Sequence, residues 1–183
     1  MLKIVFTSMI ASFLMLASNV QSEELDSGQI LREIKHKGAK SVIAEYWVTE
    51  DYQKSERLVN SISSGKKEWL EVAKLLMAES DAGVTEELFF ALSLALPKNP
   101  ISVLSLLKTQ EFRAQPTDFN IDWICRDPYY EDTVDLATEE KFLRDAEKAL
   151  VYMHDPTQDK ELDALRWQCL ESIRRDLRRV EKE

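Results

Sequence analysis

The chain has 183 residues and an acidic composition, with 24 lysines and arginines against 33 aspartates and glutamates and a net charge of −9 at pH 7. Nucleic acid and anionic lipid are bound by clustered cations, so this balance argues against both as partners and favours a partner protein that is basic. The length is sufficient for one domain that folds without a cofactor, and nothing in the composition indicates the oligomeric state.

The first 22 residues are typical of a secretory signal peptide. Lys3 supplies a positive charge, IVFTSMIASFLMLA supplies an apolar core, and Val20 and Ser22 occupy the cleavage positions. This core is shorter than the ~20 residues that cross a bilayer as a helix. We therefore expect a signal peptide at 1–22, a single helical domain at 23–183, and a periplasmic or secreted product without membrane attachment after cleavage. An uncleaved anchor is the alternative.

Apolar residues recur at helical spacing through most of the remaining chain. The sequence has only four glycines, no Asn-Gly or Asp-Gly turn, and no long alternation of apolar and polar residues. We expect an all-α fold, a compact array or bundle of seven to eight helices with short connections. The clearest apolar stripes lie in residues 39–48, 58–62, 66–80, 142–153 and 162–180.

Residues that start or end helices agree with these stripes. Gly65 is placed to end a helix, and Asn99 followed by Pro100 is a typical start. Thr85 and Thr138 each precede two glutamates, which predicts two further helix N-termini.

Residues 81–107 contain a helix that is apolar on nearly every face. Between Leu88 and Leu96 the only polar side chain is that of Ser93. A helix without a polar face is stable when neighbouring helices cover it on several sides. We expect this helix at the centre of the domain.

Two successive helix pairs, at roughly residues 39–64 and 66–96, each end in a turn and lead into another helix. This order resembles HEAT-like helical-repeat proteins, in which paired helices stack into a curved layer. The resemblance covers residues 39–108 and is based on the order of the helices, not on a specific sequence motif. The helix pairs are also shorter than the ~40-residue HEAT repeat. The stretch SDAGVTEELFFALSLALPKNP also resembles small exported bacterial helical proteins of unassigned function. The resemblance implies a stacked helical fold and no particular activity.

Residues 109–137 interrupt the helical pattern with two prolines and five aromatic residues. An irregular connection of this length inside a domain is often functional. Trp and Tyr are common in interface hot spots, so this loop is the candidate interface, although its aromatic residues could instead form a satellite core. The candidate interface residues are Phe119, Trp123, Tyr129, Tyr130 and Asp132.

The two cysteines, Cys125 and Cys169, are expected to form a disulfide, because an exported chain meets an oxidising compartment. Closing this long loop is worth about 2–4 kcal/mol. Two buried thiols are the alternative interpretation.

Catalytic and metal-binding patterns are scarce. His36 and His154 each stand at an expected helix end, where an imidazole suits the helix dipole. The acids of DPYYEDTVD could gather a calcium ion, but they lack the glycine turn of an EF-hand loop, and we favour a solvated acidic loop. A glycosidase needs two carboxyl groups, one of them with a raised pKa, and no such pair of acidic residues stands out in the sequence. We expect no enzyme activity, no cofactor and no bound metal.

The basic run RRDLRRVEKE lies near the end of the chain. We expect it to be a solvated helix face.

These observations favour an exported, non-enzymatic protein-binding domain. One concrete version is an inhibitor or immunity protein that blocks a toxin or a cell-wall hydrolase. An accessory factor of envelope assembly and a peptidoglycan-acting enzyme are the alternatives.

Overall fold

The computed structural model describes residues 25–49, 52–114, 121–126, 128, 134–155 and 157–183. The predicted signal peptide lies outside these residues. Within them the chain is all-α, as predicted, and has no strand. In chain order the helices are α1 (Ser27–Lys37), α2 (Ala39–Trp47), α3 (Tyr52–Ile62), α4 (Lys67–Met77), α5 (Ala82–Ala95), α6 (Pro100–Leu106), α7 (Gln110–Arg113), α8 (Ile121–Ile124), α9 (Leu136–Val151) and α10 (Lys160–Val180).

Eight of the ten helices in the described part of the chain have seven residues or more, which agrees with the predicted number. The other two, α7 and α8, have four residues each and lie in the segment predicted to be irregular. A single helical turn is too short to show an apolar period, so the sequence pattern does not reveal it.

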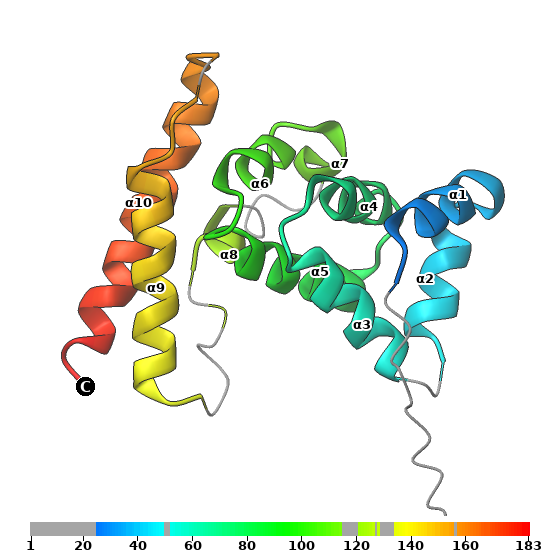
Figure 1. Cartoon of the computed structure of the whole chain (residues 1–183), viewed down its shortest axis with the longest axis horizontal. Helices are drawn as coiled ribbons and strands as arrows, with labels where there is room; N and C mark the ends of the chain where they lie inside the picture. Colours follow the sequence, from blue (N-terminus) through cyan, green and yellow to red (C-terminus); the bar gives the residue numbers. More distant parts are fainter. Residues whose placement is uncertain (1–24, 50–51, 115–120, 127, 129–133, 156) are drawn as a thin grey trace, which may run out of the picture.

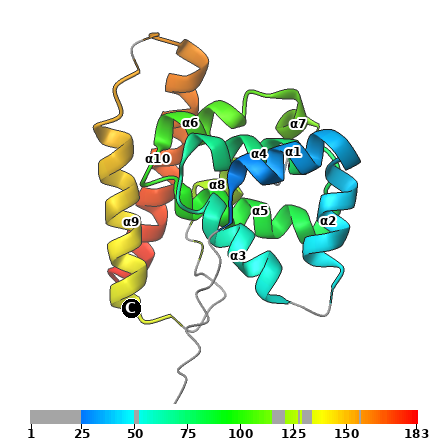
Figure 2. The same ribbon diagram turned by 45° about the vertical axis from the view of Figure 1, so that its right-hand side comes forward.

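Helices α1–α8 form one body, and α9 and α10 form an antiparallel hairpin beside it (Figures 1 and 2). Within the body α2 packs against α4, α3 against α5, and α4 against α6, so successive helix pairs lie side by side. The hairpin meets the body through α10, which packs against α6 and α8. None of the described helices is both long and apolar enough to span a membrane.

Helix α5 lies at the centre of the body and contacts α3, α4, α6 and α8, as its sequence predicts. Eight of its residues and its C-cap are buried, and even Ser93 is 0% exposed. The Ser93 hydroxyl donates a hydrogen bond of 3.4 Å to the carbonyl of Arg126, just beyond α8. The one polar residue in the apolar stretch therefore links the core to the segment that carries Cys125.

Two predicted helix starts are wrong by several residues. Helix α5 begins at Ala82 with Asp81 as its N-cap, and Thr85 is buried within the first turns. Helix α9 begins at Leu136 with Asp135 as its N-cap, and Thr138 donates its backbone N–H to the Asp135 carboxylate. In both cases an aspartate three or four residues earlier caps the helix, because a carboxylate accepts strongly from the free N–H groups of the first turn.

The other two capping predictions are confirmed. The side chain of Asn99 accepts from the backbone N–H of Ser102, and Pro100 is the first helical residue of α6. Gly65 has a φ of +71° in the turn that ends α3, and its N–H bonds to the Ile62 carbonyl at 3.0 Å. Glycine adopts this left-handed conformation without the strain that other residues incur.

Candidate functional site

A disulfide joins Cys125, directly after α8, to Cys169 in the middle of α10, as the sequence predicts. The two Cα atoms are 5.0 Å apart, within the range that a disulfide spans, and both cysteines are 0% exposed. Among the described residues there is no free cysteine. The bond fixes the four-residue helix α8 against α10, the longest helix in the described part of the chain.

Trp123 in α8 is the only one of the five candidate interface residues that lies in the described part of the chain. It is partly buried and packs against the hydrophobic core. The Arg126 guanidinium lies 4.3 Å from the centre of its ring, a cation–π distance. Trp123 is therefore held in place from two sides while part of its surface stays accessible. The remaining four, Phe119, Tyr129, Tyr130 and Asp132, lie outside the described residues.

A groove of about 300 Å³ lies between α8 and α10. Arg175 lines this groove. Its guanidinium donates to the Ser172 hydroxyl at 2.9 Å and lies 4.0 Å from the Asp122 carboxylate. The Arg175 and Asp122 side chains are both mostly exposed, so this ion pair is weak. The residues that line the groove are Ile121, Asp122, Gln168, Glu171, Ser172 and Arg175.

The segment that contains α8 carries a large part of the protein's acidity. Residues 115–135 include six aspartates and glutamates and one arginine, which is a net charge of −5 out of −9 for the whole chain. The same 21 residues include four aromatic side chains. An acidic segment with aromatic residues suits a basic protein surface, because Trp and Tyr supply contact area and the carboxylates attract cations.

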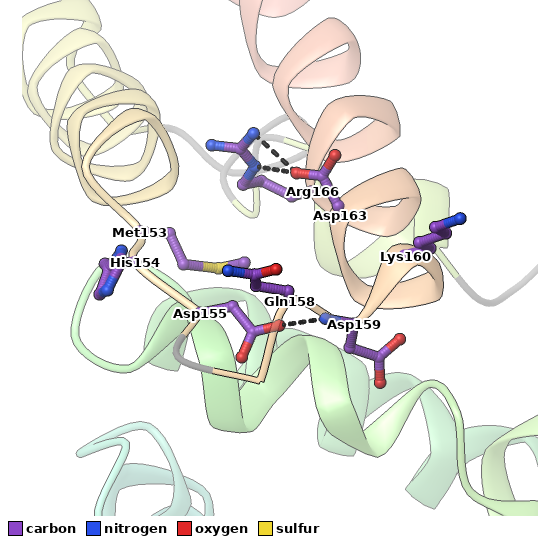
Figure 3. Close-up of a pocket in the computed structure, with 8 residues that line it drawn as sticks. All are labelled: Met153, His154, Asp155, Gln158, Asp159, Lys160, Asp163 and Arg166. Atoms are coloured by element: carbon purple, nitrogen blue, oxygen red, sulfur yellow. Dashed lines mark hydrogen bonds and ion pairs between the residues drawn. The ribbon is translucent and has the colours of Figure 1, made fainter.

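A second hollow, of about 550 Å³, lies at the turn between α9 and α10 (Figure 3). Its carboxylates already have partners. Asp155 accepts from the backbone N–H groups of Thr157 and Asp159, Asp159 caps α10 and pairs with Lys108, and Asp163 pairs with Arg166. The residues that line the hollow are Met153, His154, Asp155, Gln158, Asp159, Lys160, Asp163 and Arg166.

These interactions lower the pKa values of two carboxyl groups in this hollow, those of Asp155 and Asp159. The pKa of Asp155 is lowered chiefly by the Thr157 hydroxyl, and that of Asp159 chiefly by Lys108. A general acid in a glycosidase needs the opposite, a carboxyl group whose pKa is raised by an apolar environment. Neither Asp155 nor Asp159 therefore has the raised pKa of such a general acid.

The histidines and the calcium candidates give no support to a metal centre. His36 and His154 are both exposed, His36 in the last turn of α1 and His154 beyond the end of α9. In the part of the chain that the structure describes, no three His, Cys, Asp or Glu residues are grouped so as to hold a metal ion. Of the acids considered for calcium, Asp127, Glu131 and Asp132 lie outside the described residues, and Asp135 is the N-cap of α9.

The basic run near the C-terminus is only in part the solvated face that the sequence predicts. Arg174 donates to Glu147 at 2.7 Å, and Arg179 pairs with the buried Glu139, so these two arginines join α10 to α9. Arg178 is exposed. The register between the two helices decides which charges meet, and the sequence of one helix does not contain that information.

Comparison of the chain with protein-family models, with curated proteins and with solved structures finds no match. The resemblance to HEAT-like proteins stays a prediction, and the functional interpretation depends on the residues of this chain.

Proposed function

We propose that this protein is an exported, non-enzymatic protein-binding domain that acts as an inhibitor or immunity protein against a basic toxin or cell-wall hydrolase. The observation that carries the proposal is the position of Trp123. The core, Arg126 and the nearby disulfide at Cys125 fix this residue, which follows the groove-lining Asp122 in the chain and lies within the acidic, aromatic segment 115–135.

Three further features support this function. The disulfide is compatible with an oxidising compartment outside the cytoplasm. The carboxyl groups of Asp155 and Asp159 at the larger hollow have lowered pKa values and so stay ionised, which suits ion pairing better than proton transfer. Finally, a side chain that is fixed before binding loses little conformational entropy in the complex, which favours affinity.

The test is capture of a partner from envelope extract with three forms of the mature chain: wild type, Trp123→Ala and Trp167→Ala. Trp167 is the matched control, because it is a tryptophan that is 51% exposed on α10 and lies outside the acidic segment 115–135. A basic protein should be retained in equal amounts by wild type and Trp167→Ala. Trp123→Ala, and likewise Tyr130→Ala, should bind it at least about tenfold more weakly, as expected for a hot-spot residue.

Titration of the purified partner at increasing salt then measures the electrostatic part of the affinity. Screening by salt should slow association and weaken the complex, because exposed charges guide the encounter. If Trp123→Ala and Tyr130→Ala both bind like wild type while remaining folded, the assignment of the interface is wrong. Turnover of a peptidoglycan fragment by the purified chain would contradict the non-enzymatic function.

A further inference from the structure

Arg126 is the single basic residue of the acidic segment 115–135, which contains six aspartates and glutamates. A positive charge here works against the attraction of a basic partner, so charge alone does not account for an arginine at this position. The guanidinium carbon of Arg126 lies 4.3 Å from the centre of the Trp123 ring, within the range of a cation–π contact. The contact with Trp123 therefore offers a reason for this arginine that its charge does not.

The backbone of Arg126 is fixed from two directions. The residue before it, Cys125, is 0% exposed and forms the disulfide to Cys169 in α10. The Arg126 carbonyl accepts the hydrogen bond of 3.4 Å from Ser93, which is 0% exposed in α5. A buried hydroxyl group costs free energy unless it has a partner, so this contact also accounts for a serine in the apolar helix α5. The side chain of Arg126 therefore extends from a well-anchored point of the chain.

A guanidinium group is suited to holding an indole ring. It is flat and weakly hydrated and stacks on aromatic faces, whereas the ammonium group of a lysine is a compact and strongly hydrated charge. Trp123 also packs against the hydrophobic core, and the guanidinium adds a second contact that restricts the rotation of its ring. A side chain that is ordered before binding loses less conformational entropy when a complex forms.

We propose that Arg126 is a positioning residue of the interface, which holds the Trp123 ring in the orientation that the partner binds. Arg126 then raises the affinity for a basic partner through the shape of its side chain, although its charge opposes that partner. This role in binding rests on the proposed function; the effect of Arg126 on the Trp123 ring does not.

The first experiment measures the mobility of the Trp123 side chain in the full mature chain without a partner. Nitrogen-15 relaxation gives an order parameter for each indole N–H group, and the spectrum of Trp123→Phe identifies the signal of Trp123. Arg126→Lys keeps the charge and removes the flat group, so the order parameter of Trp123 should fall towards the ~0.6 that marks a flexible group. An unchanged order parameter would overturn the proposal, because other contacts would then hold the ring.

Arg166→Lys is the matched control, because Arg166 makes the same kind of contact elsewhere in the protein. Its guanidinium carbon lies 4.9 Å from the centre of the Trp167 ring on α10, outside the acidic segment. This variant should leave the order parameter of Trp123 at its wild-type value. An equal fall for Trp123 in both variants would indicate a general loosening of the fold and would contradict a specific role of Arg126.

The second experiment titrates the basic protein retained in the capture experiment with wild type, Arg126→Lys and Arg166→Lys. Arg126→Lys should bind about two- to tenfold more weakly, because the Trp123 side chain must then be ordered during binding. Since the charge is unchanged, this ratio to wild type should persist as salt is raised. Arg166→Lys should bind like wild type. Equal affinities of Arg126→Lys and wild type would mean that the shape of the Arg126 side chain has no role in binding.

The two proposals fail in different ways. If no protein binds wild type and the order parameter of Trp123 still falls in Arg126→Lys, the proposed function is wrong and the effect of Arg126 on the ring stands. If the order parameter falls but the captured protein binds wild type and Arg126→Lys equally, protein binding stands and the role of Arg126 in affinity is wrong.

Discussion

The α1–α6 array and the α9–α10 hairpin are held together by different forces. The array is built around α5, and residues such as Leu76, Phe89 and Leu104 are 0% exposed. The hairpin has its own apolar contacts, but many of its connections are ionic. Arg174–Glu147, Arg179–Glu139 and Arg144–Glu181 join its two helices, and Lys108–Asp159 and Arg113–Glu161 join it to the body.

Because of this difference, the stability of the array and the stability of the hairpin should respond to different conditions. Apolar burial is largely insensitive to salt, to moderate acid and to redox potential. Exposed ion pairs contribute little individually and weaken with salt, and carboxylates lose their contribution when they are protonated. The array should therefore be the stable scaffold, and the hairpin should be the part that salt and acid can loosen.

The largest expected effect comes from a cavity in the array. Phe89 is 0% exposed in α5, and its ring packs edge to face against Phe112 with centroids 6.1 Å apart. Phe89→Ala removes this contact and leaves a cavity, which should lower the free energy of unfolding by about 3–5 kcal/mol. Urea denaturation monitored by circular dichroism measures it.

The matched aromatic control in the hairpin is Trp167→Ala. Because Trp167 is 51% exposed and its main neighbour in the structure is the Arg166 guanidinium, the change should stay within about 0.5 kcal/mol. Similar losses in both variants would contradict the division into a buried scaffold and a more loosely held hairpin.

A smaller effect is expected at the junction of α3 and α6. Asn99 caps α6 and also donates its side-chain N–H to the Gly65 carbonyl at 2.9 Å, so one residue ties the turn after α3 to the start of α6. Asn99→Ala should lower the free energy of unfolding by about 1–2 kcal/mol, through the lost cap and a carbonyl left without its partner.

Asn60→Ala provides the control for this variant in the same denaturation assay. Asn60 is exposed in the middle of α3, where alanine has the higher helix propensity, so this change should be neutral or slightly stabilising. Equal destabilisation by both substitutions would mean that the capping contacts of Asn99 do not contribute to the free energy of unfolding.

Much of the array could be predicted from the sequence because its signals are local. A helix with a single serine between Leu88 and Leu96 has no face to offer to water, so its burial follows from composition. Asn99 before Pro100 defines a helix start by itself. The caps at Asp81 and Asp135 were harder to predict, because a threonine close by in each helix is also a good capping residue.

The candidate site could be predicted only in part. Counting two cysteines in an exported chain predicts the disulfide, but the partner helix of Arg174 and the groove between α8 and α10 depend on how helices align in space. The hollow at the hairpin turn had a weak local signal: the sequence from Asp155 to Asp159 is typical of a side-chain-capped turn.

The smallest expected effect is the acid sensitivity of the hairpin. Asp159 accepts from the backbone N–H groups of Glu161 and Leu162 and pairs with Lys108, and these interactions lower its pKa below the ordinary value of 3.8. A group whose pKa is lower in the folded state stabilises that state above its unfolded pKa, and the contribution disappears as the pH falls through the folded pKa. The hairpin should therefore lose stability as the pH drops below 3.8.

Asp159→Asn keeps an acceptor for the helix cap and removes the charge that attracts Lys108. The variant should be less stable than wild type near neutral pH, and its urea midpoint should approach that of wild type as the pH falls below 3.8, where the wild-type carboxyl becomes protonated. Hydrogen exchange at the start of α10 assigns the loss to the hairpin. If the difference between the two urea midpoints persists or grows in acid, Asp159 acts through its shape and not through its charge. The Asp159–Lys108 ion pair would then not be what attaches the tip of the hairpin to the body.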